Sequence, residues 1–445
     1  MKLWNPKTPF SPSEAPLHYG WAIAVVGTLG MLASVPGQTI GVNVFSERLI
    51  GALELSRINV SAAYFAGTAL SGFILPYAGT LFDRFGARRL IALASVGLAA
   101  SLVFMSFVDH LAGAVERLVS VESLGFAIRV ATLTVGFFLI RFWGQGVVMM
   151  TSRNMIGKWW VAHRGKVFSI GGIAVAVCFS LTPQAFDWLI ERVGWREAWW
   201  LMALGLAPFF CSFAWLLYRD NPQECGLEPD AGLAVDEAKS QDPEFRIVKE
   251  FQRTEALKTY SFWAFSLVFA LQACYFTAFS FHVIDVAADV GMSKGGMLAL
   301  FFPSAVLNGA VSLFVGWACD RWRLKYLLAF MASGNLVAAL GLGLAHPVIM
   351  PACVVIGFGI SGGCFGALSG VFMPRFFGLK HLGAISGFFA SLIVLGSAVG
   401  PLAFSLARSF LGSYAFAHWV AGGLSLSLMV GARWANNPQR GLAKS

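Results

Sequence analysis

Twelve runs of apolar sequence, each long enough to cross a bilayer as a helix, constrain this chain more than any other feature. They lie at about residues 19–43, 60–80, 90–108, 127–150, 166–188, 197–218, 261–287, 295–317, 326–346, 349–373, 382–406 and 414–432. A helix needs roughly 20 apolar residues to span a hydrocarbon core. Because 57% of the 445 residues are hydrophobic and 12% are charged, the composition lies outside that of soluble folds. We therefore predict an all-α integral membrane protein with twelve transmembrane helices in a lipid bilayer.

The distribution of basic residues predicts how the chain is oriented. If the N-terminus lies inside, 23 Lys and Arg residues fall in inner segments and 8 in outer ones. Lys and Arg in short loops favour the cytoplasmic side. We expect a multi-pass protein of the cell (inner) membrane with both termini cytoplasmic. The net charge of +9 is explained by this topology, so no nucleic-acid partner is expected.

A charged turn between apolar runs occurs twice. The first copy, residues 79–89, reads Gly-Thr-Leu-Phe-Asp-Arg-Phe-Gly-Ala-Arg-Arg, and the second begins at Gly316. Matching positions share one offset, in the pairs Gly79/Gly316, Asp83/Asp320, Arg84/Arg321 and Arg88/Lys325. One such turn per half predicts a duplicated six-helix unit.

The turn resembles the loop between the second and third helices of the major facilitator superfamily of twelve-helix secondary transporters. The resemblance implies two six-helix pseudo-symmetric bundles. The expected parts are a cytoplasmic N-terminal tail (1–18), an N-terminal bundle (19–218), a cytoplasmic linker (219–260), a C-terminal bundle (261–432) and a cytoplasmic tail (433–445). Within the linker we expect a short helix around 244–258, and outside the membrane an amphipathic helix within 109–126, lying on the bilayer surface.

The resemblance also implies that the two turns form an inner latch that stabilises an outward-open state. Its expected residues are Gly79, Asp83, Arg84, Gly86, Arg88, Asp320 and Arg321. A carboxylate is favourable at a helix N-terminus. We therefore expect Asp83 near the start of helix eleven, around 380–383, and Asp320 near the start of helix five, around Gly165.

Three further stretches resemble the monocarboxylate and oxalate–formate branch of that superfamily. They are Lys158-Trp159-Trp160-x-x-x-Arg164-Gly165, Gly194-Trp195-Arg196-Glu197-Ala198 and Phe281-His282-Val283-Ile284-Asp285. The branch implies an organic carboxylate substrate. It has an Arg in helix eight where this chain has Ser312, and the monocarboxylate carriers have Asp where this chain has Asn308. Carboxylate recognition is therefore either absent or moved to Arg141.

Polar residues inside apolar runs are candidates for binding a solute or a proton, because they are costly in lipid. Arg141 is the strongest, since an unpaired charge at the bilayer centre costs at least ~2.5 kcal/mol. Arg141-x-x-x-Gln145-Gly146 also resembles the fourth-helix motif whose Arg is implicated in proton coupling. The other candidates are Gln38 in helix one, Gln272, Tyr275 and His282 on one face of helix seven, and Asn308 in helix eight. Hydrogen bonding between helices or to backbone carbonyls is the alternative role for each.

We predict a secondary active transporter of a small organic solute, with an organic (mono)carboxylate favoured. It would work as a monomer by alternating access, driven by a proton or solute gradient. An enzyme is not expected, because the chain has no phosphate loop, nucleophile elbow or zinc-binding His motif. The seven scattered cysteines predict no metal site, and we expect no cofactor. A proton-driven exporter of hydrophobic or cationic compounds, favoured by the glycine spacing of helix eleven, and a non-transporting receptor or scaffold remain alternatives.

Overall fold

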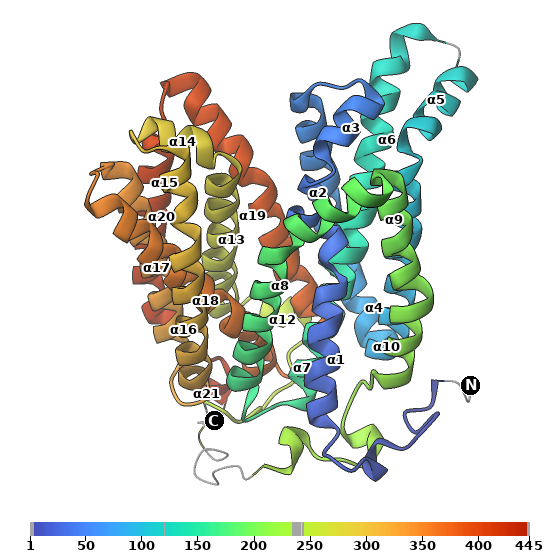
Figure 1. Cartoon of the computed structure of the whole chain (residues 1–445). Coiled ribbons are helices and arrows are strands. Elements are labelled where there is room, and N and C mark those ends of the chain that lie inside the picture. The colour runs from blue at the N-terminus through green and yellow to red at the C-terminus, as the bar shows by residue number, and fades with distance from the viewer. Residues whose placement is uncertain (1–3, 120, 234–241, 243, 443–445) are drawn as a thin grey trace. The chain divides into compact units, whose positions relative to one another are not determined.

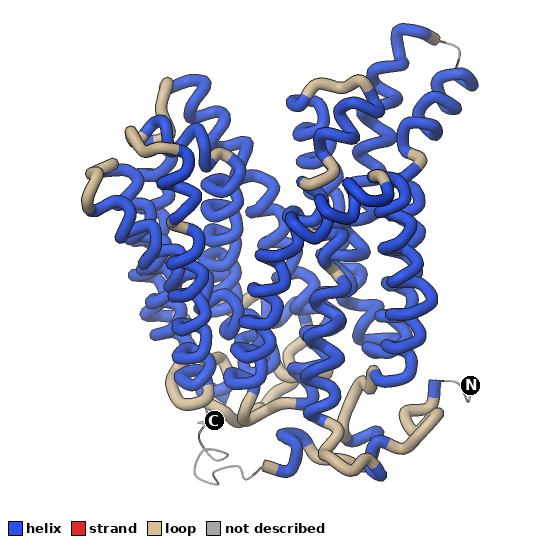
Figure 2. The backbone as a smooth tube through the Cα atoms, in the orientation of Figure 1, coloured by secondary structure: helices blue, strands red, loops and turns tan. Residues whose placement is uncertain are grey.

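A computed structural model describes residues 4–119, 121–233, 242 and 244–442. Helices and connecting turns make up all of this part of the chain, with no strand among the described residues (Figures 1 and 2). The chain divides into two compact units. Unit 1 comprises 1–159, 174–231 and 386–391, and unit 2 comprises 160–173, 232–385 and 392–445.

Unit 1 begins with a broken helix and continues through a long kinked one. Its helices are α1 (Gly20–Ala33), α2 (Thr39–Asn43), α3 (Ser46–Leu53), α4 (Arg57–Ser106), α5 (Val108–Val119), α6 (Gly125–Ile140), α7 (Met149–Trp159), α9 (Trp195–Leu204) and α10 (Cys211–Leu217). The helix α8 (Arg164–Val193) runs through both units. Two π-helical segments, Arg141–Val148 and Gly205–Phe210, join α6 to α7 and α9 to α10. The Pro36-Gly37 step ends α1 in a short 3-10 turn, because proline cannot donate to a continuing helix.

The 50-residue helix α4 contains two membrane spans. Gly86 interrupts it with φ +75° and ψ 171°, a conformation that glycine adopts without strain. Eleven helices of the described residues are long and apolar enough to cross a membrane, and α4 is one of these eleven. Counting α4 as two confirms the twelve predicted spans.

Unit 2 holds the remaining helices. They are α12 (Arg253–Ala256), α13 (Tyr260–Phe281), α14 (Val283–Asp289), α15 (Lys294–Ala299), α16 (Phe301–Cys319), α17 (Leu324–Leu344), α18 (Ile349–Phe377), α19 (Leu382–Leu411), α20 (Ala415–Gly431) and α21 (Gln439–Leu442). Side chains cap the starts of α13 and α15: Thr259 accepts from the backbone N–H of Phe262, and Ser293 accepts from that of Gly296. Such caps satisfy backbone donors that the first helical turn leaves free.

The linker helix expected around 244–258 is wrong in extent, because only Arg253–Ala256 is helical. The backbone N–H groups of Val248 and Lys249 donate to the Gln439 side chain, which in turn donates to the carbonyl of Lys249. These bonds hold the segment in an extended form against the C-terminal residues. Residues 234–241 and 243 of the predicted linker lie outside the described residues.

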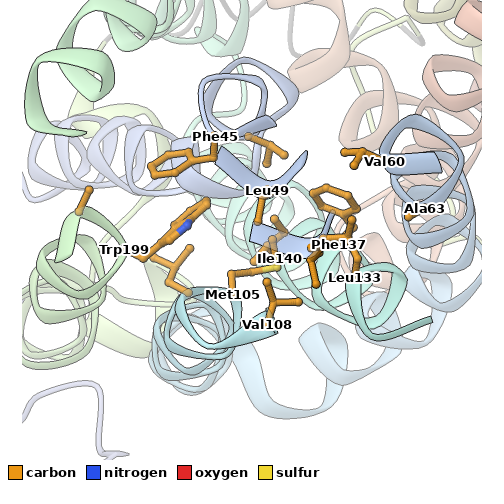
Figure 3. Packing of buried hydrophobic residues seen from close by; sticks show 14 of the residues in the cluster. Phe45, Leu49, Val60, Ala63, Met105, Val108, Leu133, Phe137, Ile140 and Trp199 are labelled. Atoms are coloured by element: carbon orange, nitrogen blue, oxygen red, sulfur yellow. The ribbon is translucent and has the colours of Figure 1, made fainter. Parts of the chain in front are cut away.

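Aromatic and aliphatic side chains from distant segments form the packed interior of unit 1 (Figure 3). Phe45 stacks on Trp199 with ring centroids 3.8 Å apart, and Phe137 packs in the same cluster. Large apolar side chains on the surface, such as Phe209 and Ile58, are exposed, as lipid contact requires. Close packing inside and apolar side chains outside are the pattern of a helix bundle in a membrane.

The helix predicted within 109–126 is present as α5, and its charged face is paired. Asp109 forms two hydrogen bonds with Arg196, at 2.8 and 2.6 Å, and Glu116 pairs with Arg129 at 2.8 Å. Burial would raise the pKa of Asp109, but Arg196 outweighs burial and the pKa is lowered. Leu118 lies on the opposite, exposed face. The placement of α5 on the bilayer surface stays a prediction.

Candidate functional site

The backbone comes unusually close to itself where the break in the first span meets the π-helix. A Cβ atom on Gly37 would lie 2.3 Å from the Ile140 carbonyl oxygen and 2.8 Å from the Cα atom of Gly144. Only glycine fits at such a distance. The π-helix begins at Arg141, and π-helical turns occur frequently at functional sites.

Arg141 is a buried cation with an incomplete set of partners. Its side chain is 1% exposed, and its Nη1 donates to the Gly37 carbonyl at 3.1 Å. The guanidinium carbon lies 5.4 Å from the centroid of the Tyr64 ring, a cation–π contact. Nε and Nη2 have no hydrogen-bond partner among the described residues. The contacts of Arg141 are therefore a carbonyl and an aromatic ring, neither of which carries a negative charge.

The other candidates of unit 1 differ in how completely they are bonded. Gln145 has a buried Oε1 with no partner among the described residues, one turn beyond Arg141. Gln38 donates from Nε2 to the Ser34 hydroxyl at 2.9 Å, so its amide nitrogen has a partner within its own broken helix. Tyr64 donates to the Thr39 hydroxyl at 2.8 Å, which holds its ring beside Arg141. Arg141 and Gln145 are therefore two side chains with open polar atoms, about one turn apart in the same π-helical segment.

Three of the candidates in unit 2 lie along α13. Gln272 and Tyr275 are buried, and His282 ends the helix as its C-cap residue. Tyr275 hydrogen-bonds through its hydroxyl to Nδ1 of His418 at 2.9 Å, whereas Oε1 of Gln272 has no partner among the described residues. The Nε2 atom of His282 lies 3.0 Å from the Pro401 carbonyl oxygen.

The remaining candidate in unit 2, Asn308, packs against the backbone of α18. A Cβ atom on Gly362 would lie 2.4 Å from the Nδ2 atom of Asn308. The Asn308 side chain therefore occupies the space that a side chain at position 362 would take. Ser312, one turn on, is 2% exposed, and its hydroxyl has no partner among the described residues. Asn308 and Ser312 therefore belong to a close crossing of α16 and α18.

In unit 1 the first charged turn is fixed by contacts that hold the end of α10 and the N-terminal segment. Arg88 donates to the carbonyls of Trp215, Asn5 and Thr8, at 2.5, 3.0 and 2.7 Å. Asp220 accepts from the backbone N–H of Ala87 at 2.9 Å, directly after the kink at Gly86.

The other members of the first turn are placed differently from Arg88. Arg84 is exposed and lies over the Phe85 ring. Gly79 packs closely against Gly387. A Cβ atom on Gly387 would lie 3.0 Å from the Cα atom of Gly79. The contact expected between Asp83 and residues 380–383 would join the two units, and it stays a prediction.

In unit 2 the second charged turn caps the start of α8. Asp320 accepts hydrogen bonds from the backbone N–H groups of Gly165 at 2.9 Å and Lys166 at 3.2 Å. Its carboxylate is 2% exposed and lies 3.9 Å from the guanidinium of Arg375. A carboxylate at a helix N-terminus is favourable by charge and hydrogen bonding. This is the contact that the sequence predicted near Gly165. Arg321 of the same turn is exposed and lies over the Trp317 ring.

Sequence reasoning missed two residues that the structure places among these groups. His418 lies inside the apolar run 414–432, and the rule that identified Arg141 would also have identified it. Asp220 pairs with Lys158 at 2.8 Å and fixes the Gly86 turn, but it follows the sixth span without a local signal. Only the folded chain brings Asp220 to residues more than a hundred positions away.

Comparison with protein families gives one match that covers most of the chain. The family described as Major Facilitator Superfamily matches residues 23–401. No curated protein matches significantly.

Several solved structures share the fold at low sequence identity. The proton:xylose symporter XylE bound to 6-bromo-6-deoxy-D-glucose is 16% identical, with a TM-score of 0.61, covering 93% of this chain and 94% of that one. The human organic anion transporter MFSD10 is 15% identical, with a TM-score of 0.60, covering 94% of this chain and all of that one (100%). The transporter FucP, in the outward conformation, is 13% identical with a TM-score of 0.60, covering 94% and 99%.

Proposed function

Because the chain belongs to the major facilitator superfamily, we propose that it is a secondary active transporter of a small organic anion, with Arg141 as the group that binds the anion. It is a membrane transporter with the twelve-helix fold of that superfamily. The class of solute, the driving gradient and the residues that bind the solute are the proposed part.

The observation that carries the proposal is the incomplete bonding of Arg141. A buried guanidinium with two nitrogens lacking partners is unfavourable, because a buried charge needs pairing and hydrogen bonds. A carboxylate can supply both at once, since its two oxygens match the fork of a guanidinium. Gln145, one turn away, can donate a further hydrogen bond from its amide nitrogen. A neutral solute would leave the charge of Arg141 uncompensated.

The basic residues of the loops support the proposed orientation, and the charge of the proposed solute supports the driving force. The excess of Lys and Arg in alternate loops supports a cell membrane location with both termini cytoplasmic. An inward proton gradient is the natural partner for an anion, because a co-transported proton cancels its charge. We further propose that the protein works as a monomer, and that Asp83 and Asp320 stabilise one of its two access states.

Uptake into liposomes containing the purified full-length chain tests the proposal. The panel contains lactate, oxalate and benzoate as anions, xylose as a neutral solute, and choline and tetraphenylphosphonium as cations. We expect uptake of at least one anion, stimulated by an acidic exterior, and its loss in Arg141→Ala. An exposed arginine outside the proposed site and latch, replaced in the same way, as Arg48→Ala, is the matched control. Transport of the cations or of xylose alone would contradict the proposal, as would the absence of any flux.

A further inference from the structure

A string of polar and titratable side chains runs along one end of unit 2, from the end of α13 into the bundle. It begins at His282, where α13 passes into α14 (Figure 1). Nδ1 of His282 lies 3.4 Å from the Tyr414 hydroxyl and 4.0 Å from a carboxylate oxygen of Asp285. The Asp285 side chain is 67% exposed. His282 therefore connects a solvent-exposed carboxylate with a tyrosine at the start of α20.

The string continues to His418, one turn further along α20. The backbone N–H of His418 donates to the carbonyl of Tyr414, so both side chains lie on the same face of that helix. The Phe404 ring packs against both, with centroids 5.8 Å from Tyr414 and 5.3 Å from His418. His418 is 1% exposed.

The hydrogen bonding of His418 is half complete. Its Nδ1 is bonded to the Tyr275 hydroxyl at 2.9 Å, and its Nε2 has no partner among the described residues. A neutral imidazole has one donor and one acceptor, so one of them is left open here. Leaving a buried polar atom unpaired costs ~1–3 kcal/mol. A histidine kept only for packing would be replaced by an apolar residue without that cost.

We propose that His418 is the proton-binding site of this transporter, that Tyr275 positions it, and that His282 and Tyr414 give it access to solvent. The inference rests on the proposed function, since it names where the driving proton binds. In the tautomer with Nδ1–H donating to the Tyr275 oxygen, the Nε2 lone pair accepts a proton from hydronium, leaving water and an imidazolium. Release to water at the other side of the membrane reverses the step, and no bond other than N–H changes.

The charged groups around the string favour this assignment. Asp289 is held by Arg408 at 2.6 Å, the Ser413 hydroxyl at 2.8 Å and the Tyr414 backbone N–H at 2.9 Å. It is a fixed negative charge at the same end of the unit, which favours a cation on His418. The other helix packed along α20 is α17, whose titratable residues, Lys325 and Tyr326, lie in its first turn. On α13 the titratable neighbours are Tyr275 itself and Cys274, and on α19 the charged one is Arg408.

The site differs in kind from the proposed anion site. Arg141 keeps its charge at all accessible pH values, whereas the imidazole of a histidine can bind and release a proton. The proton and the anion are then bound by different units of the chain, the proton by unit 2 and the anion by unit 1.

Nuclear magnetic resonance of the protein in lipid, with 15N in its histidine rings, tests the site without any solute. The sequence has seven histidines, and His418→Gln assigns the relevant signal by its loss. We expect the His418 ring to be neutral at pH 8 and to become protonated as the pH is lowered to 3.5, because burial opposes its charge. Tyr275→Phe should move the midpoint of that change, whereas His346→Gln, an exposed histidine, should not. A His418 ring that stays neutral down to pH 3.5 would overturn the proposal. If His418→Gln does not fold, the shift caused by Tyr275→Phe identifies the signal.

Transport supplies a second, independent measurement. For any of lactate, oxalate or benzoate that the wild-type protein moves, His418→Gln should abolish accumulation driven by an acidic exterior but retain exchange across equilibrated membranes. Equal loss of both activities would show that His418 does not carry the driving proton. If none of the three anions moves, the proposed function fails while the spectroscopic measurement still decides the proton site.

Discussion

Arg141 illustrates how a single residue can be costly for folding and useful for binding. Its buried guanidinium has one carbonyl and one aromatic ring as partners, so its charge is not neutralised within the protein. Replacing a poorly paired buried charge by an apolar side chain of similar length often stabilises a protein. Binding sites frequently show this trade between stability and activity.

We therefore expect Arg141→Met to raise the thermal unfolding midpoint of the solute-free protein and to abolish anion binding. Each hydrogen bond to a charged group contributes ~1.5–3 kcal/mol, which corresponds to ~10- to 100-fold in affinity. Arg141→Met removes both of the bonds that the guanidinium would form with the anion. Differential scanning fluorimetry and equilibrium binding measure the two effects. Arg141→Lys, which keeps the charge but not the fork, should fall between wild type and Arg141→Met in affinity. An Arg141→Met protein that is both less stable and still able to bind anions would show that the arginine is structural.

At this scale the sequence indicates Arg141 because a charge in an apolar run stands out without any knowledge of the fold. Gln38 stands out as an uncharged polar residue in an apolar run, yet its amide nitrogen is bonded to Ser34. His418 shows the converse. It carries the same sequence signal, but its open nitrogen becomes visible only when Tyr275 is seen beside it. Whether a buried polar side chain has all its hydrogen-bond partners depends on its neighbours in space, which the sequence alone does not give.

The break in the first span and the π-helix of the fourth cross where neither has room for a side chain. The break at Gly37 and the π-helix at Gly144 touch through their backbones. We expect Gly37→Ala to destabilise the protein by ~1–3 kcal/mol, since backbone atoms can yield less than side chains. Gly309→Ala is the matched control, because a Cβ atom there meets nothing within 4 Å. Thermal unfolding in detergent compares the two, and equal effects would contradict this account of the crossing.

The hydrogen-bonded carboxylate of Asp289, at the end of α14, allows a prediction about how stability depends on pH. Burial would raise the pKa of Asp289, but the Tyr414 N–H, the Ser413 hydroxyl and Arg408 outweigh burial, and the pKa is lowered. A lowered pKa in the folded state contributes stability that is present above the unfolded value of about 3.9 and is lost as pH falls through the folded value. The difference in unfolding midpoint between wild type and Asp289→Asn should thus stay constant from pH 8 to pH 5 and shrink below pH 4. A difference that disappears between pH 7 and pH 5 would assign the effect to another group.

For the whole molecule, the duplicated turn provides the prediction about access. A charge at a helix terminus contributes ~1–2 kcal/mol in partly buried geometry, which corresponds to about a 5- to 30-fold change in population. Asp83→Asn and Asp320→Asn should each shift the resting population towards the inward-open state and leave anion affinity largely intact. Loss of anion binding with unchanged access in either variant would place that aspartate in the binding site.

Labelling of single cysteines on the inner and outer sides of the solute path measures this shift. Cys178 is exposed and has to be replaced first. Burial raises the pKa of the Cys225 thiol to about 11, so this cysteine stays unreactive at neutral pH. Arg48→Ala, which alters an exposed cation outside the turn, is the control.

The overall fold follows from the sequence because membrane spans are long, apolar and local. The twelve runs predict the spans, and the resemblance of the repeated turn to the superfamily implies their arrangement in two bundles. What the sequence does not contain are the partners supplied from far along the chain. Examples are Asp220 at the Gly86 turn and Gln439 along the linker, both of which act on backbone groups that carry no residue-specific signal. The short linker helix was predicted wrongly for that reason.

The π-helix at Arg141–Val148 has a consequence for how this chain is compared with its relatives. A π-helical turn holds one residue more than an α-helical turn, so it is equivalent to a single-residue insertion. In an alignment with a relative whose fourth span is uniformly α-helical, matching Arg141 displaces Lys158 by one position, unless a gap is opened between them. Deleting one residue from this segment would rotate everything beyond it by about 100° around the helix axis. Residue roles transferred from relatives across this span therefore need the gap to be placed within 141–148.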